Sequence, residues 1–359
     1  MTTVPFAFLS TSQNISWHTN SSKIIIDVYT MIRSPFTGGK VVLHSEKRTA
    51  TFRKEMFEYT FLCYKCVDTQ ELFTTTQMDT VNTMQVYNQY RTKYGIPFPD
   101  EIRNIRKRYG LSASKMSLIL GFGENQYRLY ENGDMPSLTN GRILKTIQAP
   151  NVFTNFVEAA KNVLSIEEYE NIILHLKEID EGSHACEVIK RLIFACDNRT
   201  EWNGYALPSI SKLKNTILFF IQKFDGVFVT QMNKLLFYAD FLLYRNRGMG
   251  LTGLTFKAAP YGPVPEHWDR VYSLLDDIEQ VPIESKNGNS GFKLISSLLF
   301  DEASLTEDEV DCLNTVYTTF ISTTPSAISE TSHKEPAWLN NINQHARINY
   351  NYAFSLKAL

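Results

Sequence analysis

Long apolar runs, paired cysteines and an excess of charge of one sign are all missing from this sequence. No stretch approaches the ~18 consecutive apolar residues that a membrane span requires, and residues 217–221 are typical of the longest runs. The five cysteines are an odd number without regular spacing, which favours reduced thiols over a disulfide framework. The first residues lack the basic segment of a signal peptide. These absences predict a soluble, cytoplasmic protein that does not enter a membrane.

Charge balance and motif content exclude further classes of protein. With 36 Lys and Arg against 38 Asp and Glu, the net charge is −2, which excludes a globally basic nucleic-acid binder but not a local basic surface. The chain contains no P-loop, HExxH or GxSxG motif, and neither His333 nor Asp240 has a nucleophile or ligand partner at a suitable spacing. We therefore expect no enzyme activity, no catalytic residue and no cofactor, and we interpret Asp240 as a structural hydrogen-bonding residue.

One glycine-rich segment, residues 248–253, matches the GxGxxG pattern of dinucleotide-binding loops. In such a site a strand precedes the glycines and a helix follows them, so that the phosphate meets a helix N-terminus. Here an expected long helix precedes the glycines and a strand-like segment at 254–257 follows. We interpret these glycines as the end of a helix and a loop; the alternative is a nucleotide-dependent enzyme.

The remaining composition is that of a globular protein with two to three domains, since 43% of the 359 residues are hydrophobic and 21% are charged. Short β-like runs at 24–29, 40–44, 50–52 and 57–62 precede several helical segments, which predicts an α+β fold that is mainly α. The expected units are an N-terminal extension (1–23), a small β-rich, zinc-ribbon-like domain (24–78), a helix-turn-helix DNA-binding domain (79–150), a helical connector (151–205), a mostly helical C-terminal domain with a small hairpin (206–340) and a tail (341–359).

Local signals place several boundaries of elements. Ser165 begins a capping box before a helix in the connector, and Thr306 with Glu309 predicts a second capping box before the final long helix. Thr230 is expected to cap an amphipathic helix with one apolar stripe. Pro265 is expected to be the first residue of a helix over 266–278, and residues 281–295 are predicted to form a hairpin.

Residues 111–144 carry a helix-turn-helix pattern. Ser112 is the expected cap of the first helix, Gly-Phe-Gly at 121–123 forms the turn, and the second helix is expected over 124–131. Asparagine and glutamine suit the edge of adenine and arginine suits that of guanine. The residues that we expect to contact DNA are Ser112, Ser114, Lys115, Asn125, Gln126 and Arg128.

The charge around this pattern supports the prediction. Between residues 91 and 128, eight Lys and Arg face three acidic residues, a local net charge of +5 that would attract phosphates. The alternative is an ordinary three-helix module with solvated charges.

A CxxC pair, Cys63 and Cys66, is typical of one half of a zinc-binding site. A zinc ribbon needs four thiolate or imidazole ligands, and the second pair would fall at Ser34 and Thr37, whose hydroxyls do not supply thiolates at neutral pH. We interpret His44, the nearby imidazole, as a strand surface residue and expect no bound metal.

The first half of the chain also carries a series of short motifs. They are Ser-Pro-Phe-Thr-Gly-Gly-Lys (34–40), Tyr-Lys-Cys (64–66), Phe-Thr-Thr-Thr (73–76), Val-Tyr-Asn-Gln-Tyr (86–90) and Tyr-Gly-Ile-Pro-Phe-Pro (94–99). With these motifs, residues 30–150 resemble the MqsA-like antitoxins, in which a zinc-ribbon-type domain precedes an Xre/Cro-type helix-turn-helix. In this resemblance Ser34, Thr37 and Thr69 stand where zinc-binding members have cysteine, and Cys66 alone remains. The resemblance implies a ribbon-like fold with a degenerate metal site.

The C-terminal domain carries its own motifs. They are Lys-Leu-Leu-Phe-Tyr-Ala-Asp (234–240), the glycine loop (248–253), Ala-Ala-Pro-Tyr-Gly-Pro-Val-Pro (258–265) and Ser-His-Lys-Glu-Pro-Ala-Trp (332–338). With them, residues 208–340 resemble the Panacea, or SocA-like, antitoxin domain, which accompanies many unrelated toxins. The resemblance implies a toxin-neutralising module, for which Tyr261, Pro263 and Trp268 are candidate contacts. The alternative is that these aromatic residues belong to the core.

Together the two resemblances imply an antitoxin of a type II toxin–antitoxin system. Such a protein neutralises a co-encoded protein toxin by direct binding and represses its own operon. The expected partners are the toxin, operator DNA and a second copy of the chain, because dimeric helix-turn-helix proteins read half-sites one helical turn apart. The alternatives are a stand-alone transcription regulator and a protease adaptor that delivers a bound partner for degradation.

Overall fold

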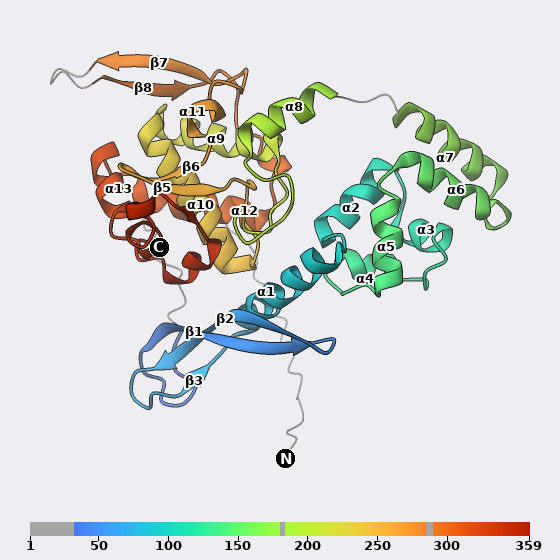
Figure 1. Ribbon diagram of the computed structural model, residues 1–359, viewed down its shortest axis with the longest axis horizontal. Helices are drawn as coiled ribbons and strands as arrows, with labels where there is room; N and C mark the ends of the chain where they lie inside the picture. Colours follow the sequence, from blue (N-terminus) through green and yellow to red (C-terminus); the bar gives the residue numbers. More distant parts are fainter. Residues whose placement is uncertain (1–31, 180–183, 285–289) are drawn as a thin grey trace, which may run out of the picture.

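The computed structural model describes residues 32–179, 184–284 and 290–359, in which helices combine with three small antiparallel sheets (Figure 1). This content agrees with the expected α+β, mainly α fold. The expected N-terminal extension and the expected strand at 24–29 lie outside the described residues. Within the described ranges, no helix is both long enough and apolar enough to cross a membrane.

The N-terminal part begins with a long hairpin. Its strands are β1 (Val41–Phe52) and β2 (Glu55–Cys66), and the short β3 (Leu72–Phe73) pairs with the end of β2. The three shorter runs expected here are therefore parts of two continuous strands. The prediction missed this because Arg53 and Lys54 make the two-residue turn with positive φ, a conformation usually taken by glycine or asparagine.

A 19-residue helix, α1 (Thr76–Tyr94), packs on this hairpin where the sequence showed only a polar segment. The side chain of Asn82 accepts a hydrogen bond from the Leu62 N–H (2.8 Å) and donates one to the Leu62 carbonyl (2.9 Å). Gln85 makes the same pair of bonds with Thr60, at 2.9 and 2.8 Å. The two amides thus bind the β2 backbone as a neighbouring strand would, and their burial costs little because they are paired.

A second module consists of short helices around its own apolar core. They are α2 (Pro99–Arg108), α3 (Ala113–Ile119), α4 (Gln126–Glu131), α5 (Leu138–Thr146), α6 (Pro150–Ala159) and α7 (Ile166–Ile179). Tyr127 of α4 shares this core with Phe153 of α6 and Leu176 of α7, so the first part of the expected connector belongs to the module. The predicted capping box is confirmed, since Ser165 and Glu168 exchange two bonds of 3.1 and 3.2 Å between side chain and backbone.

The C-terminal domain surrounds α10 (Val229–Arg247), in which every residue from 231 to 244 is buried. The expected single apolar stripe is wrong, because other elements cover this helix on all sides. Thr230 does not cap it either: α10 begins at Val229, and Phe228 precedes it. The other helices are α8 (His184–Ile193), α9 (Ile210–Phe224), α11 (Trp268–Val271), α12 (Glu307–Phe320), α13 (Pro325–Ser332) and α14 (Pro336–Leu339).

Two small sheets complete the domain. One contains β6 (Gly262–Pro265), β5 (Phe256–Ala259) and β9 (Arg347–Ile348), and the other contains β4 (Val227–Phe228), β8 (Ser290–Ile295) and β7 (Glu279–Glu284). The β7–β8 pair confirms the predicted hairpin. Pro265 ends β6 instead of starting a helix, because it pairs with Phe256 at the edge of the sheet, where a missing N–H is tolerated.

The last residues are not a tail. β9 pairs with β5, and Tyr350, Ala353 and Phe354 are buried in the core around α10. Tyr205, from the end of the expected connector, belongs to the same core. The buried cluster therefore extends beyond both expected limits of the C-terminal domain.

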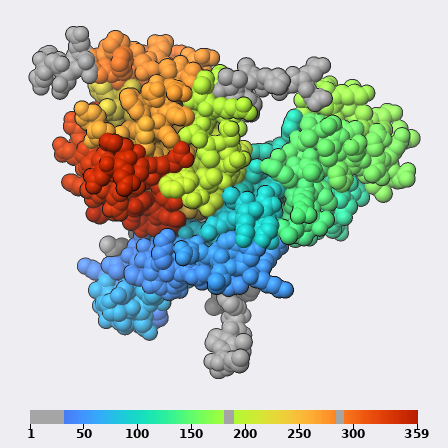
Figure 2. Space-filling model, in the orientation of Figure 1, coloured from blue at the N-terminus to red at the C-terminus, as the bar shows by residue number. Residues whose placement is uncertain are grey.

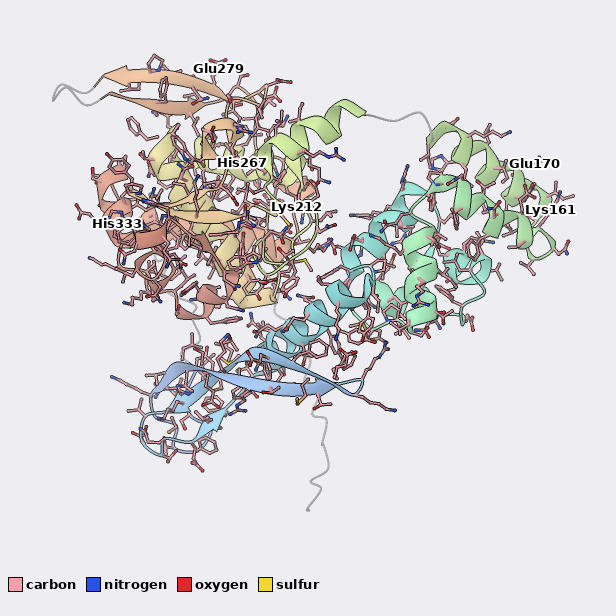
Figure 3. All side chains as sticks on the ribbon, in the orientation of Figure 1. Lys161, Glu170, Lys212, His267, Glu279 and His333 are labelled. Carbon is pink, nitrogen blue, oxygen red and sulfur yellow. The ribbon has the colours of Figure 1, made fainter. Side chains whose placement is uncertain are left out.

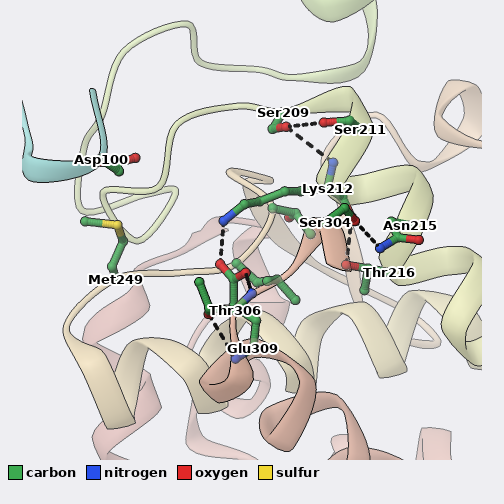
Figure 4. A network of polar contacts seen from close by, with 12 residues as sticks. Asp100, Ser209, Ser211, Lys212, Asn215, Thr216, Met249, Ser304, Thr306 and Glu309 are labelled. Carbon is green, nitrogen blue, oxygen red and sulfur yellow. Dashed lines mark hydrogen bonds and ion pairs between the residues drawn. The ribbon is translucent and has the colours of Figure 1, made fainter. Parts of the chain in front are cut away.

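Polar contacts fix α9 against α12 (Figure 4). Lys212 forms an ion pair with Glu309, whose backbone N–H and side chain complete the predicted capping box with Thr306. Asn215 donates a hydrogen bond to Ser304 (2.6 Å) in the loop before α12. These bonds hold the loop between the second sheet and α12 at the domain surface.

The N-terminal hairpin and the C-terminal domain share one buried cluster, in which Leu62 and Val81 lie with the residues of α10. Figure 2 shows the hairpin and α1 along one side of the C-terminal domain, with the α2–α7 module beyond them. Asn88 of α1 donates a hydrogen bond to the Gly248 carbonyl (2.8 Å) at the end of α10. The guanidinium of Arg199, 4% exposed, pairs with Asp100 (2.5 Å) at the start of α2 and so links the module to the C-terminal domain.

Candidate functional site

The predicted DNA contacts lie on α3, on α4 and in the turn between them. Ser112 caps α3 through a hydrogen bond to a backbone N–H. Ser114, Asn125 and Arg128 are exposed, whereas Gln126 is half-buried. The second helix begins at Gln126, two residues later than expected, so Asn125 precedes its first turn.

Tyr127 fixes the position of α4. Its side chain is fully buried, and its hydroxyl donates a hydrogen bond to the Ile102 carbonyl of α2 (2.8 Å). Its backbone N–H donates to the Ser117 hydroxyl of α3 (3.1 Å). Because both bonds are buried, the outward face with Asn125 and Arg128 is held on a rigid support.

The positive charge exposed on this module is smaller than the composition predicted. Lys115 pairs with Glu168 of α7 (2.7 Å), Arg106 pairs with Glu131 (2.5 Å), and Arg91 is fully buried. These cations were counted as an attractive patch, but they hold the helices together. The exposed cations include Lys107 of α2 and Arg128 of α4. Two more, Arg142 and Lys145, lie on α5 and were not among the predicted DNA contacts.

The residues expected at a degenerate metal site, Ser34, Thr37, Cys66 and Thr69, come together around the Cys66 thiol. The hydroxyls of Ser34, Thr69 and Thr37 hydrogen-bond to the buried Cys66 sulfur, with Thr37 at 3.7 Å, and they lower the pKa of this thiol to about 6. Cys63 points elsewhere and donates to the His44 carbonyl (3.6 Å). In the part of the chain that the structure describes, no group of three or more His, Cys, Asp or Glu could hold a metal ion.

Asp240 holds the glycine-rich loop. Its Oδ1 accepts the backbone N–H groups of Leu251 (2.8 Å) and Thr252 (2.9 Å), and its Oδ2 accepts the Thr252 hydroxyl (2.6 Å). Burial raises the pKa of Asp240 to about 6, opposed by these bonds. The loop thus closes around a carboxylate of its own domain, which confirms the structural interpretation of Asp240.

A pocket with a volume of about 560 Å³ lies between the first turns of α10, the β5–β6 hairpin and α11. Its apolar wall includes Val229, Ala258, Ala259, Pro260 and Val264. The aromatic residues Tyr261 and Trp268 line it as well, and they are 74% and 42% exposed. Its ionisable side chains other than Tyr261 are Lys234, Lys257 and His345, so the lining contains cations and no carboxylate.

Lys234 is the unusual member of this lining. Its side chain is 1% exposed, and among the described residues no side chain or backbone oxygen forms a hydrogen bond or ion pair with its ammonium. Burial lowers the pKa of Lys234 to about 8. A buried cation without a counter-charge is costly and therefore uncommon.

Gly262 allows the chain to approach this lysine. A Cβ at this position would lie 2.4 Å from the Ser332 hydroxyl and 2.7 Å from Lys234 Cε, and the residue has a φ of +107°. Only glycine satisfies both conditions. The motifs at 234–240, 258–265 and 332–338 therefore meet at one point.

The 332–338 motif also supports the wall of the pocket. The His333 ring, on the C-terminal domain in Figure 3, stacks on Trp338 with ring centroids 4.2 Å apart. The indole N–H of Trp338 donates to the Ala259 carbonyl (2.8 Å) at the end of β5. Burial and the nearby Lys234 ammonium lower the pKa of His333.

The three candidate toxin contacts thus differ in their exposure and in whether they line the pocket. Tyr261 and Trp268 are exposed at the pocket, so they are not core residues, whereas Pro263 is buried in β6 and does not line it. Adjacent residues of a strand point to opposite faces, and Val264 is the one that reaches the pocket. Lys234 was not among the predicted site residues, although its place within the mostly apolar stretch 232–239 is a signal in the sequence.

A largely apolar pocket with few polar groups is typical of a ligand- or partner-binding domain. Residues 232–339 match the family model described as Antitoxin SocA-like, Panacea domain. The chain therefore contains an antitoxin-like domain in its C-terminal half, as expected from the motifs. Comparison with curated proteins and with solved structures found no match.

Proposed function

We propose that the chain is the antitoxin of a type II toxin–antitoxin system and that its C-terminal domain neutralises a protein toxin by direct binding. The observation that carries this proposal is the Panacea match at 232–339. The family motifs within this range converge on the pocket beside Lys234 and Gly262, which gives the domain a built surface for a partner.

The N-terminal half is proposed to bind the operator and to repress the operon. In this proposal the β1–β3 hairpin with α1 is the MqsA-like ribbon without metal, and α3–α4 is the helix-turn-helix. Exposed Asn125 and Arg128 would contact bases, while Arg142 and Lys145 would contact phosphates. A homodimer would place two such units on a palindromic operator.

Neutralisation is tested by co-expressing the full chain with the open reading frame encoded beside it. Rescue of growth, with a stoichiometric complex in a pull-down, would support the proposal. If the neighbouring product were not toxic and formed no complex, neutralisation would be wrong. Rescue accompanied by a shortened half-life of the partner would instead support the protease-adaptor alternative.

Point variants are preferable to truncation near residue 205 in this experiment. Leu62 and Val81 pack with the residues of α10, so removing the C-terminal domain would expose apolar surface on the N-terminal half. Tyr261→Ala removes a side chain that is 74% exposed and should leave the fold intact.

Operator binding is tested by fluorescence anisotropy with a fragment of the chain's own promoter. Arg128→Ala should weaken binding about tenfold or more, since a bidentate base contact contributes about 1–3 kcal/mol. Lys161→Ala is a matched control, because Lys161 is exposed at the far end of the same module (Figure 3). Equal binding by both variants would contradict the proposed role of α4.

A further inference from the structure

The polarity and charge of the residues lining the pocket beside Lys234 indicate what kind of group it binds. Its wall is mostly apolar, its ionisable groups other than Tyr261 are Lys234, Lys257 and His345, and its lining contains no carboxylate. The acidic residues next to the lining in the sequence already have partners: Asp269 pairs with Arg270 (3.6 Å) and Glu266 pairs with Arg347 (2.8 Å). A negatively charged group would therefore meet no repulsion from the lining and would find an ammonium that has no counter-charge among the described residues.

The surrounding structure keeps Lys234 in this position. It lies on α10, where residues 231–244 are all buried, and Gly262 and Ser332 approach it closely from β6 and α13. With 1% of its surface exposed, the side chain cannot turn to solvent without moving these elements. The ammonium is thus preorganised for a ligand, which lowers the entropic cost of binding.

We propose that this pocket binds a carboxylate carried next to an apolar or aromatic group of the protein partner. The carboxylate pairs with Lys234, and the apolar group lies between Tyr261 and Trp268. This inference rests on the proposed function for the source of the carboxylate, but the pocket chemistry itself does not depend on it. The volume of about 560 Å³ accommodates an aromatic acid or one large side chain with its neighbour.

The chemistry is tested first with small probes and the full-length chain. 3-Phenylpropionate and its neutral amide have the same shape and differ in charge, and calorimetry or Trp268 fluorescence reports their binding. We expect the acid to bind about tenfold more tightly than the amide, the usual range for one charge-assisted hydrogen bond. In Lys234→Met this preference should disappear, whereas Lys223→Met, an exposed lysine of α9 outside the pocket, should retain it. Equal binding of the two probes, or no binding of either, would overturn the proposal.

The source of the carboxylate is tested with the partner. Lys234→Met and Tyr261→Ala should each weaken the complex with the co-encoded toxin about tenfold or more, and 3-phenylpropionate should compete with it. If the acid binds through Lys234 but the complex is unchanged in both variants, the pocket serves a small carboxylic acid and our assignment to a protein partner is wrong. If the wild-type chain forms no complex at all, the proposed function fails, while the probe titration still decides the chemistry of the pocket.

Discussion

Replacing Lys234 by methionine should stabilise the protein. Methionine has a similar length and no charge, so it fills the same space in the core around α10 without the buried ammonium. The pKa of Lys234 is about 8, roughly 2.5 below the 10.5 of a free lysine. At about 1.4 kcal/mol per pH unit, the charged side chain lowers the free energy of unfolding at pH 7 by about 3 kcal/mol.

The free energy of unfolding should also depend on pH, and the direction of this dependence provides a second check. Between pH 8 and 10.5 the unfolded chain keeps a proton on Lys234 that the folded chain has lost, so the stability of the wild type rises relative to that of the variant. The advantage of Lys234→Met should therefore be fully present below pH 8 and should vanish above pH 10.5.

Urea unfolding at pH 7 and pH 9.5, followed by tryptophan fluorescence, measures both effects. Trp202, Trp268 and Trp338 all lie in the C-terminal half and report on the relevant core. Lys223→Met is the control, and a change within about 0.5 kcal/mol is expected for this surface position. If Lys234→Met lowers the free energy of unfolding, or if its gain does not shrink at pH 9.5, the ammonium has a stabilising partner and our reasoning is refuted.

Three further predictions concern other groups. Gly262→Ala should lower the free energy of unfolding by about 2 kcal/mol or more in the same urea assay, because of its positive φ and its contacts with Lys234 and Ser332; an unchanged midpoint would contradict the close approach. Asp240→Ala should cost about 2–4 kcal/mol, since it leaves the buried Leu251 and Thr252 N–H groups without their acceptor, and should make the 248–253 loop sensitive to limited proteolysis; continued resistance would count against Asp240 as its support. The Cys66 thiolate should contribute to stability above pH 9 and lose this contribution as the pH falls through about 6. This thiolate absorbance at 240 nm should titrate near pH 6, and the transition should be absent in Cys66→Ser; a midpoint near 9 would be inconsistent with the hydroxyl hydrogen bonds to this sulfur.

Several features of this protein could be predicted because neighbouring residues determine them. The helix caps at Ser112 and Ser165 and the Thr306 capping box are present as expected, since each depends on one side chain and the next three backbone N–H groups. The β7–β8 hairpin and the Panacea domain were found for the same reason, because their patterns are continuous in the sequence.

The prediction was wrong where a residue's role depends on a distant partner. Asn82 and Gln85 look like surface residues of a polar segment, but they bind the backbone of β2. Lys115 and Arg106 count toward a positive patch in the sequence, but carboxylates on other helices pair with them and reduce its net charge. Composition counts charges and amides, and it does not show which of them meet after folding.

By itself, the sequence determined the α+β content, the antitoxin-like C-terminal domain and the exposed positions of Asn125 and Arg128. Only the tertiary structure showed that Lys234, Gly262 and Ser332 meet beside a pocket, that the last residues belong to the core, and that Pro263 is buried. The physical reason is the distance along the sequence over which each kind of interaction acts. Periodicity and capping act over a few residues, whereas Lys234 and Ser332 are 98 residues apart and meet only when α10, β6 and α13 pack together.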